Sequence, residues 1–102
     1  MMNTIINRLQ LKDFRLILAI HKTGQLAMAA DQLAMSQPAA SRMLASTEKM
    51  IGTHLFERHP KGMVATPIGE ILARNAINLL QGLEAAENEV SSFGAGLGGT
   101  AR

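Results

Sequence analysis

The sequence predicts a mainly α-helical protein of three short helices, a two-stranded hairpin and one long helix. Apolar residues recur at helical spacing up to Gly52. Two short segments with strand character then flank a Pro/Gly turn, and helical spacing returns from Thr66 onward. This order of elements is that of a winged helix-turn-helix followed by a long helix.

Composition limits the class of protein. The 102 residues suffice for one modest core, and 47% of them are hydrophobic. No apolar run approaches the roughly 18 residues of a membrane span, and the first residues lack the order of a secretion signal. The absence of Cys excludes disulfides and thiolate metal sites. We therefore expect a cytoplasmic protein with no membrane partner, metal or cofactor.

Charge is distributed unevenly along the chain. Residues 1–74 hold nine Lys/Arg and five Asp/Glu, whereas residues 75–102 hold one and three. The positive potential therefore belongs to the segment with the short helices and hairpin, where it would attract phosphates. Aromatic side chains amount to three Phe, which argues against a base-stacking platform for RNA or single strands.

We expect residues 1–8 to form a flexible lead-in to the domain at 9–66. A first helix should run from Leu9 or Leu11 to about Lys22, where Thr23-Gly24 ends it. Spacing of i, i+3 and i+4 gives its predicted core-facing side: Leu11, Phe14, Ile17, Leu18 and His21. On this side His21 is expected to be a packed or capping histidine rather than a ligand.

A helix-turn-helix is predicted at about 26–45. The short second helix has small and apolar residues on one side: Leu26, Ala29, Ala30 and Leu33. Its paired alanines permit a close helix crossing, and Ala34-Met35 makes the turn. Gln25 stands where a Ser or Thr cap is usual, which predicts a start weaker by about 1 kcal/mol. Ser36 can cap the third helix, whose first turn tolerates Pro38.

The third helix has two different sides. Its predicted core side consists of Ala40, Leu44, Thr47 and Ile51. Its predicted outer side carries nothing bulky or acidic and consists of Gln37, Pro38, Ser41, Arg42 and Ala45. Gln can bond adenine, Arg can bond guanine, and the helix N-terminus favours phosphate. We therefore predict DNA contacts from Ser36, Gln37, Pro38, Ala39, Ser41 and Arg42.

An ordinary solvated helix can also carry Gln, Ser and Arg. The alanine-rich helix and tight turn before this face, and the hairpin after it, favour DNA binding. This hairpin, the wing, is predicted at about 54–66, with Phe56 and Val64 facing inward. Arg58 and Lys61 are expected to contact DNA, and the less favoured alternative for Lys61 is a solvated turn lysine.

Thr66-Pro67 is a strong helix start, and the long helix should span 67–91. Its apolar residues alternate in steps of four and three, as in a coiled-coil seam: Ile68, Leu72, Ala76, Leu79, Leu83, Ala86 and Val90. A second copy of the chain is the simplest partner for this seam, which predicts a homodimer. The alternative is a helix that folds back to complete its own core. Residues 92–102 are Gly-rich and predict a linker toward a further domain.

Four motifs together resemble the N-terminal domain and linker helix of LysR-type transcriptional regulators. They are Leu26-Ala27-Met28-Ala29-Ala30-Asp31-Gln32-Leu33, Ser36-Gln37-Pro38-Ala39-Ala40-Ser41-Arg42, Gly52-Thr53-His54-Leu55-Phe56-Glu57-Arg58 and Thr66-Pro67-Ile68-Gly69-Glu70. The resemblance covers about 9–90, nearly the whole chain.

The resemblance implies a transcriptional activator or repressor that binds double-stranded DNA. Gln37, Pro38, Ser41 and Arg42 match positions from which the family reads DNA, and Arg58 matches its wing arginine. The long helix matches the one through which members pair antiparallel. Full-length members commonly form tetramers and bind a small-molecule effector through a larger domain, which would be absent here.

Three positions depart from the family pattern. Gln25 replaces the usual cap. Thr47 stands where Leu is usual, which would leave a polar group near the core and loosen the third helix. Ala45-Ser46 is less basic than is common, which predicts a shallower salt dependence of binding.

Two other functional classes are alternatives to DNA binding. A protein-interaction module that docks a partner on its long helix would bind no duplex at low salt. An enzyme is disfavoured because the sequence has no nucleophile–base pair and no metal-ligand spacing. The Gly cluster at 94–99 follows a helix rather than a strand, which excludes a dinucleotide fingerprint.

Overall fold

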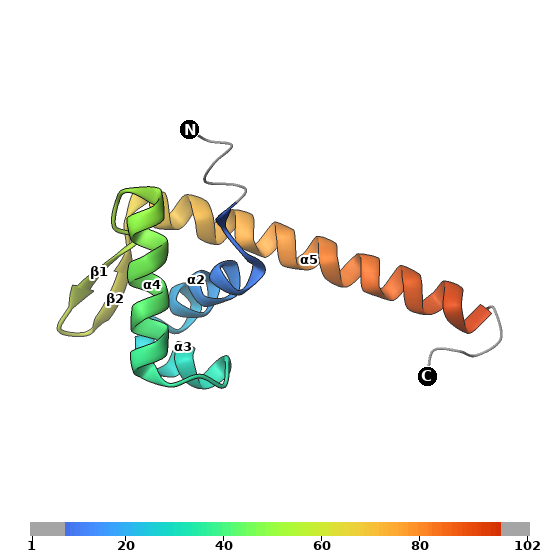
Figure 1. Cartoon of the computed structure of the whole chain (residues 1–102), viewed down its shortest axis with the longest axis horizontal. Coiled ribbons are helices and arrows are strands. Elements are labelled where there is room, and N and C mark those ends of the chain that lie inside the picture. The colour runs from blue at the N-terminus through green and yellow to red at the C-terminus, as the bar shows by residue number, and fades with distance from the viewer. Residues whose placement is uncertain (1–7, 97–102) are drawn as a thin grey trace.

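The computed structural model describes residues 8–96, so residues 1–7 of the expected lead-in and residues 97–102 of the expected linker lie outside it. The elements are α2 (Leu11–Thr23), α3 (Leu26–Gln32), α4 (Gln37–Ile51), β1 (Phe56–His59), β2 (Gly62–Ala65) and α5 (Pro67–Gly96). Three short helices and an antiparallel hairpin gather around the start of α5, whose remainder projects away from them (Figure 1). The predicted fold class is confirmed.

The core lies where α2 meets α3, α4 and α5. Leu16, Ile17 and Ile20 of α2 are almost completely buried. The alanines that other helices bring to them are equally buried: Ala29, Ala30, Ala40, Ala73 and Ala76. Small residues at these positions let the helices approach closely, as the Ala29-Ala30 pair predicted.

The predicted core-facing side of α2 is wrong in part. Leu11 and His21 are exposed, and Phe14 and Leu18 are only half-buried. The buried residues are Asp13, Leu16, Ile17, Ala19 and Ile20. Because α2 is apolar around most of its circumference and packs against three helices, helical spacing alone fits more than one face.

Thr47 is buried but not without partners. Its Oγ1 lies 2.9 Å from the Met43 carbonyl oxygen and 3.3 Å from Asp13 Oδ1, and can donate to either. Asp13 Oδ2 accepts the Gln10 N–H at 2.8 Å. Within residues 8–96, no buried side-chain nitrogen or oxygen lacks a hydrogen-bond partner. The polar group expected near the core is therefore present and satisfied, while its effect on the stability of α4 stays a prediction.

Helix ends follow the predicted local signals. Gly24 and Gly52 end α2 and α4 in the left-handed conformation, with φ of 72° and 96°. Ser36 Oγ accepts the Ala39 N–H at 3.2 Å and caps α4. Thr66 Oγ1 accepts the Gly69 N–H at 3.1 Å and caps α5.

One expectation about the wing and one about the long helix are wrong. The strand register pairs Glu57 with Val64 and Arg58 with Met63, so Val64 points outward and is 53% exposed, while Met63 packs on the core. Phe56 is buried as predicted. α5 continues to Gly96, so 92–96 are helical rather than a linker. No helix in residues 8–96 has the length and apolar character needed to cross a membrane.

Candidate nucleic-acid interface

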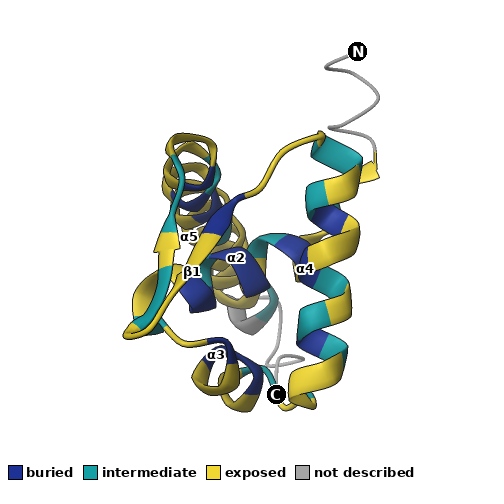
Figure 2. Cartoon of the chain, turned by 90° about the vertical axis from the view of Figure 1, so that its left-hand side faces the viewer, coloured by how far each residue is buried: buried dark blue, intermediate teal, exposed yellow. Residues whose placement is uncertain are grey.

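The outer side of α4 is a continuous polar and basic face. Gln37, Pro38 and Arg42 are exposed on its first two turns, and Ser41 is half-buried at its edge. Ser36 is exposed at the cap, and Ala39 is half-buried. Buried residues of α4 lie on the side toward the other helices, while its outer side is exposed (Figure 2).

Sequence reasoning missed Lys49 as part of this face. Lys49 is exposed and follows Arg42 by seven residues, which returns it to the same side of the helix about 10 Å further along. The i+7 spacing was visible in the sequence. Ala45, also exposed, lies between them. The face therefore carries two cations, and no acidic side chain is exposed on it.

The wing lies beside this face. One shallow hollow between α4 and the wing is lined by Ser41, Ala45 and Arg58, among others. A second hollow is lined by Gln25, Gln37 and Arg58. Arg58 thus borders both hollows and joins the two parts of the predicted site. Lys61 is exposed in the turn at the wing tip.

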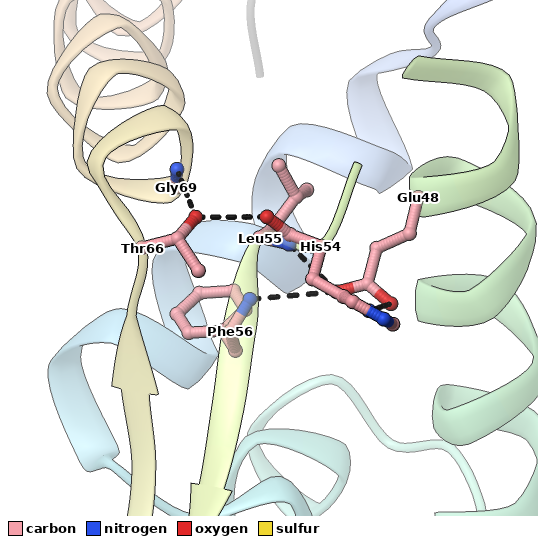
Figure 3. A network of polar contacts seen from close by, with 6 residues as sticks. All are labelled: Glu48, His54, Leu55, Phe56, Thr66 and Gly69. Carbon is pink, nitrogen blue, oxygen red and sulfur yellow. Dashed lines mark hydrogen bonds and ion pairs between the residues drawn. The ribbon is translucent and has the colours of Figure 1, made fainter. Parts of the chain in front are cut away.

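A polar network joins the end of α4, the wing and the start of α5 (Figure 3). Glu48 Oε2 accepts the Leu55 N–H at 2.7 Å and the Phe56 N–H at 3.4 Å, and Oε1 lies 3.2 Å from His54 Nδ1. Thr66 Oγ1 donates to the His54 carbonyl at 2.8 Å. The carboxylate of Glu48 therefore holds the first residues of the wing against α4.

The Lys and Arg side chains of residues 8–96 have no carboxylate partner. All three ion pairs in this part of the chain involve histidines: His21–Glu70, His54–Glu48 and His59–Glu57. No carboxylate of the described residues therefore neutralises Arg42, Arg58 or Lys61. His21 joins α2 to α5 at 3.0 Å and is neither packed in the core nor a helix cap.

The predicted seam of α5 divides into two groups. Ala76 is fully buried against its own domain and Leu72 packs partly on the core, so both already have partners within the protomer. The other members are exposed: Ile68, Leu79, Leu83, Ala86 and Val90. The seam expectation included Ala76 wrongly because a step of four from Leu72 passes onto the side that faces α2.

Residues 11–70 match the family described as "Bacterial regulatory helix-turn-helix protein, lysR family". The chain belongs to the lysR family. The lysR family comprises regulators and not enzymes, and the resemblance seen in the four motifs is confirmed.

Two of the relatives share the name HTH-type transcriptional regulator GbpR. The chain is 39% identical over 93 residues to the one from Azospirillum brasilense, covering 91% of this chain and 27% of that protein. It is 37% identical over 92 residues to the one from Rhizobium radiobacter, covering 88% and 30%. The chain thus spans less than a third of the length of these relatives.

Solved structures agree with this assignment. The BenM_DBD/catB site 1 DNA complex matches with a TM-score of 0.80 and 26% identity, over 85% of this chain and 98% of that one. The fold of this lysR-family chain is therefore that of a protein solved on DNA.

Proposed function

We propose that this chain is the sequence-specific DNA-binding domain of a cytoplasmic lysR-family transcriptional regulator, and that it binds duplex DNA as a homodimer joined through α5. The outer side of α4 is the observation that carries the proposal. It offers an amide, a hydroxyl and a guanidinium at the start of a helix, with no exposed acidic side chain among them. A major groove accepts such a helix.

The predicted contacts divide by chemistry. Gln37 and Arg42 can form paired hydrogen bonds to adenine and guanine edges, and Pro38 or Ala39 can touch a thymine methyl. Ser36, Ser41 and the N-terminal amides of α4 suit phosphate or nearby base edges. These contacts place the first turns of α4 in the major groove.

The cations around α4 suit the phosphate backbone. Lys49 extends the line of Arg42 along the helix, while Arg58 and Lys61 approach from the wing. Since none has a carboxylate partner among residues 8–96, each can replace counterions on DNA without first breaking an ion pair there. Phosphate contacts of this kind fix the register of the domain on the duplex.

A dimer would present two such faces to two half-sites. The exposed apolar residues of α5 support this part of the proposal. They extend along the helix beyond the part that the domain of the same protomer can cover, so a second protomer is needed to bury them. The BenM_DBD structure, which is a DNA complex, supports duplex DNA as the partner.

Because the relatives are about three times as long as this chain, we propose that the domain acts within a longer regulator, as a tetramer that activates or represses transcription. A small-molecule effector would bind elsewhere in that protein. No cofactor is required for the contacts described above.

A helical interaction module without DNA binding is the competing function, and the exposed seam of α5 favours it as much as a dimer. Duplex binding separates the two. The affinity for a labelled random-sequence duplex would be measured by fluorescence anisotropy across a salt series. The logarithm of the association constant should fall linearly with the logarithm of the salt concentration, with a slope of about −0.9 per phosphate contacted. Dimerisation without any duplex binding at low salt would reject the proposal in favour of the interaction module.

A further inference from the structure

The wing tip is tied to the α2–α3 turn at two points. The Met63 N–H donates to the Gly24 carbonyl oxygen at 2.8 Å, and Gln25 Nε2 donates to the Lys61 carbonyl oxygen at 3.1 Å. Gly62 lies between them with φ of 142°, and a Cβ atom there would overlap the Gly24 carbonyl. The turn of the wing is therefore in close contact with the start of the helix-turn-helix.

The side chain of Gln25 bonds the wing instead of capping α3. It is the N-cap residue of α3 but makes no side-chain cap hydrogen bond. Its amide instead reaches a residue 36 positions later in the chain. A Ser or Thr could cap α3 but is too short to reach Lys61. Gln25 replaces the usual cap residue, which predicted a weaker start of α3. In the structure its side chain forms a hydrogen bond to the wing.

This bond fixes the wing at a residue predicted to meet DNA. Lys61 is exposed and has no carboxylate partner in the part of the chain that the structure describes. Holding its carbonyl therefore sets where its side chain begins without occupying its ammonium group. Gln25, Gln37 and Arg58 also line one hollow, so the same amide borders the space between α4 and the wing.

We propose that Gln25 is a positioning residue for DNA binding, which holds the wing tip so that Lys61 meets a backbone phosphate while α4 lies in the groove. The inference rests on the proposed function. The base of the wing is held by Glu48, and Gln25 would hold its tip. The wing would then meet DNA as a rigid arm rather than as a mobile hairpin.

Two substitutions of Gln25 separate positioning from stability. Gln25→Ala removes the bond to Lys61 and adds nothing, while Gln25→Ser removes the same bond and supplies a helix cap. Both should weaken binding to a random-sequence duplex about three- to tenfold, the range expected for one lost hydrogen bond. Thermal melts should show the Ser variant to be more stable than the Ala variant. Affinity that follows thermal stability, with the Ser variant binding as tightly as the parent, would overturn the inference.

A double-mutant cycle tests whether Gln25 acts through Lys61. Lys61→Ala should weaken binding and lower the salt slope by about 1 for each bound protomer, because each protomer loses one phosphate contact. Gln25→Ala should then have no further effect in the Lys61→Ala background. Independent, additive effects would overturn the inference. If the parent itself binds no duplex, the proposed function fails and this inference with it; if the parent binds and Gln25→Ala changes nothing, only this inference fails.

Discussion

The two halves of α5 have the same kind of sequence and opposite surroundings. In the first half, Gly69, Ala73 and Ala76 are buried against the domain. In the second half, every side chain from 81 to 93 is exposed, including Val90 at 72% and Phe93 at 71%. Apolar residues continue at helical spacing through both. The difference indicates that the first half belongs to the core of its own protomer, whereas the apolar residues of the second half await a partner.

Close packing holds the first half in place. Small residues let α5 approach α2 and the wing, and Thr66 ties the start of α5 to His54. From 81 to 93 the side chains are exposed. A helix of 30 residues is about 45 Å long, more than a domain of this size can cover. Substitutions in the two halves should therefore affect different measurements.

The largest effect is expected at the exposed seam. Leu79→Asp would bury two carboxylates in the dimer, each at a cost of several kcal/mol, and should raise the dimer dissociation constant at least about 100-fold. Sedimentation equilibrium measures this constant. Ile77→Asp is the matched control, because Ile77 is 39% and Leu79 40% exposed but the two lie about 200° apart around the helix. Equal effects of the two substitutions would show that the seam does not form the dimer.

The same substitution in each half gives a second contrast. A Cβ at Gly69 would overlap the Leu55 carbonyl oxygen, whereas one at Gly82 meets nothing within 4 Å. Gly69→Ala should destabilise the fold by about 3 kcal/mol, the upper end of overpacking effects. Gly82→Ala should stabilise it by about 0.5–1 kcal/mol through helix propensity. Urea unfolding followed by circular dichroism measures both, and a stable Gly69→Ala variant would contradict the close packing of α5.

A smaller effect is expected where α4 meets the wing that supports α5. Glu48→Ala leaves the Leu55 N–H, which belongs to a fully buried residue, without its carboxylate acceptor. The expected loss is about 1–3 kcal/mol of unfolding free energy. Glu57→Ala is the control, since Glu57 is exposed on the wing and should change stability by less than about 0.5 kcal/mol. Indistinguishable urea midpoints for the two variants would remove Glu48 from this role.

Local chemistry was readable from the sequence, and tertiary choices were not. Gly24, Gly52, Ser36 and Thr66-Pro67 end or begin helices as predicted, because caps depend on neighbouring residues only. The prediction that Val64 faces inward was wrong, because the hairpin register decides whether Met63 or Val64 faces the core.

The same reason explains the other misses. Which apolar face of α2 is buried depends on three helices that pack around it. The assignment of Ala76 to the seam was wrong. Its burial depends on where α2 lies, and the spacing of residues within α5 does not reveal that position. The bond from Gln25 to Lys61 crosses 36 positions and had no local signal beyond the missing cap. For the candidate site, α4 and the wing could be predicted from the sequence. The position of Arg58 at the border of both hollows could not be predicted.

The central claim is that the outer side of α4 reads DNA, and one comparison of affinities tests it most directly. The parent, Arg42→Ala and Arg15→Ala would be titrated with a duplex selected from a random pool and with the random pool itself. Arg15 is an exposed cation whose surroundings come from α2, α3 and α5 and from neither α4 nor the wing. We expect Arg42→Ala to lose about 1–3 kcal/mol on the selected duplex and less on the random one. If Arg42→Ala bound both duplexes as tightly as the Arg15→Ala variant does, α4 would not be the recognition helix.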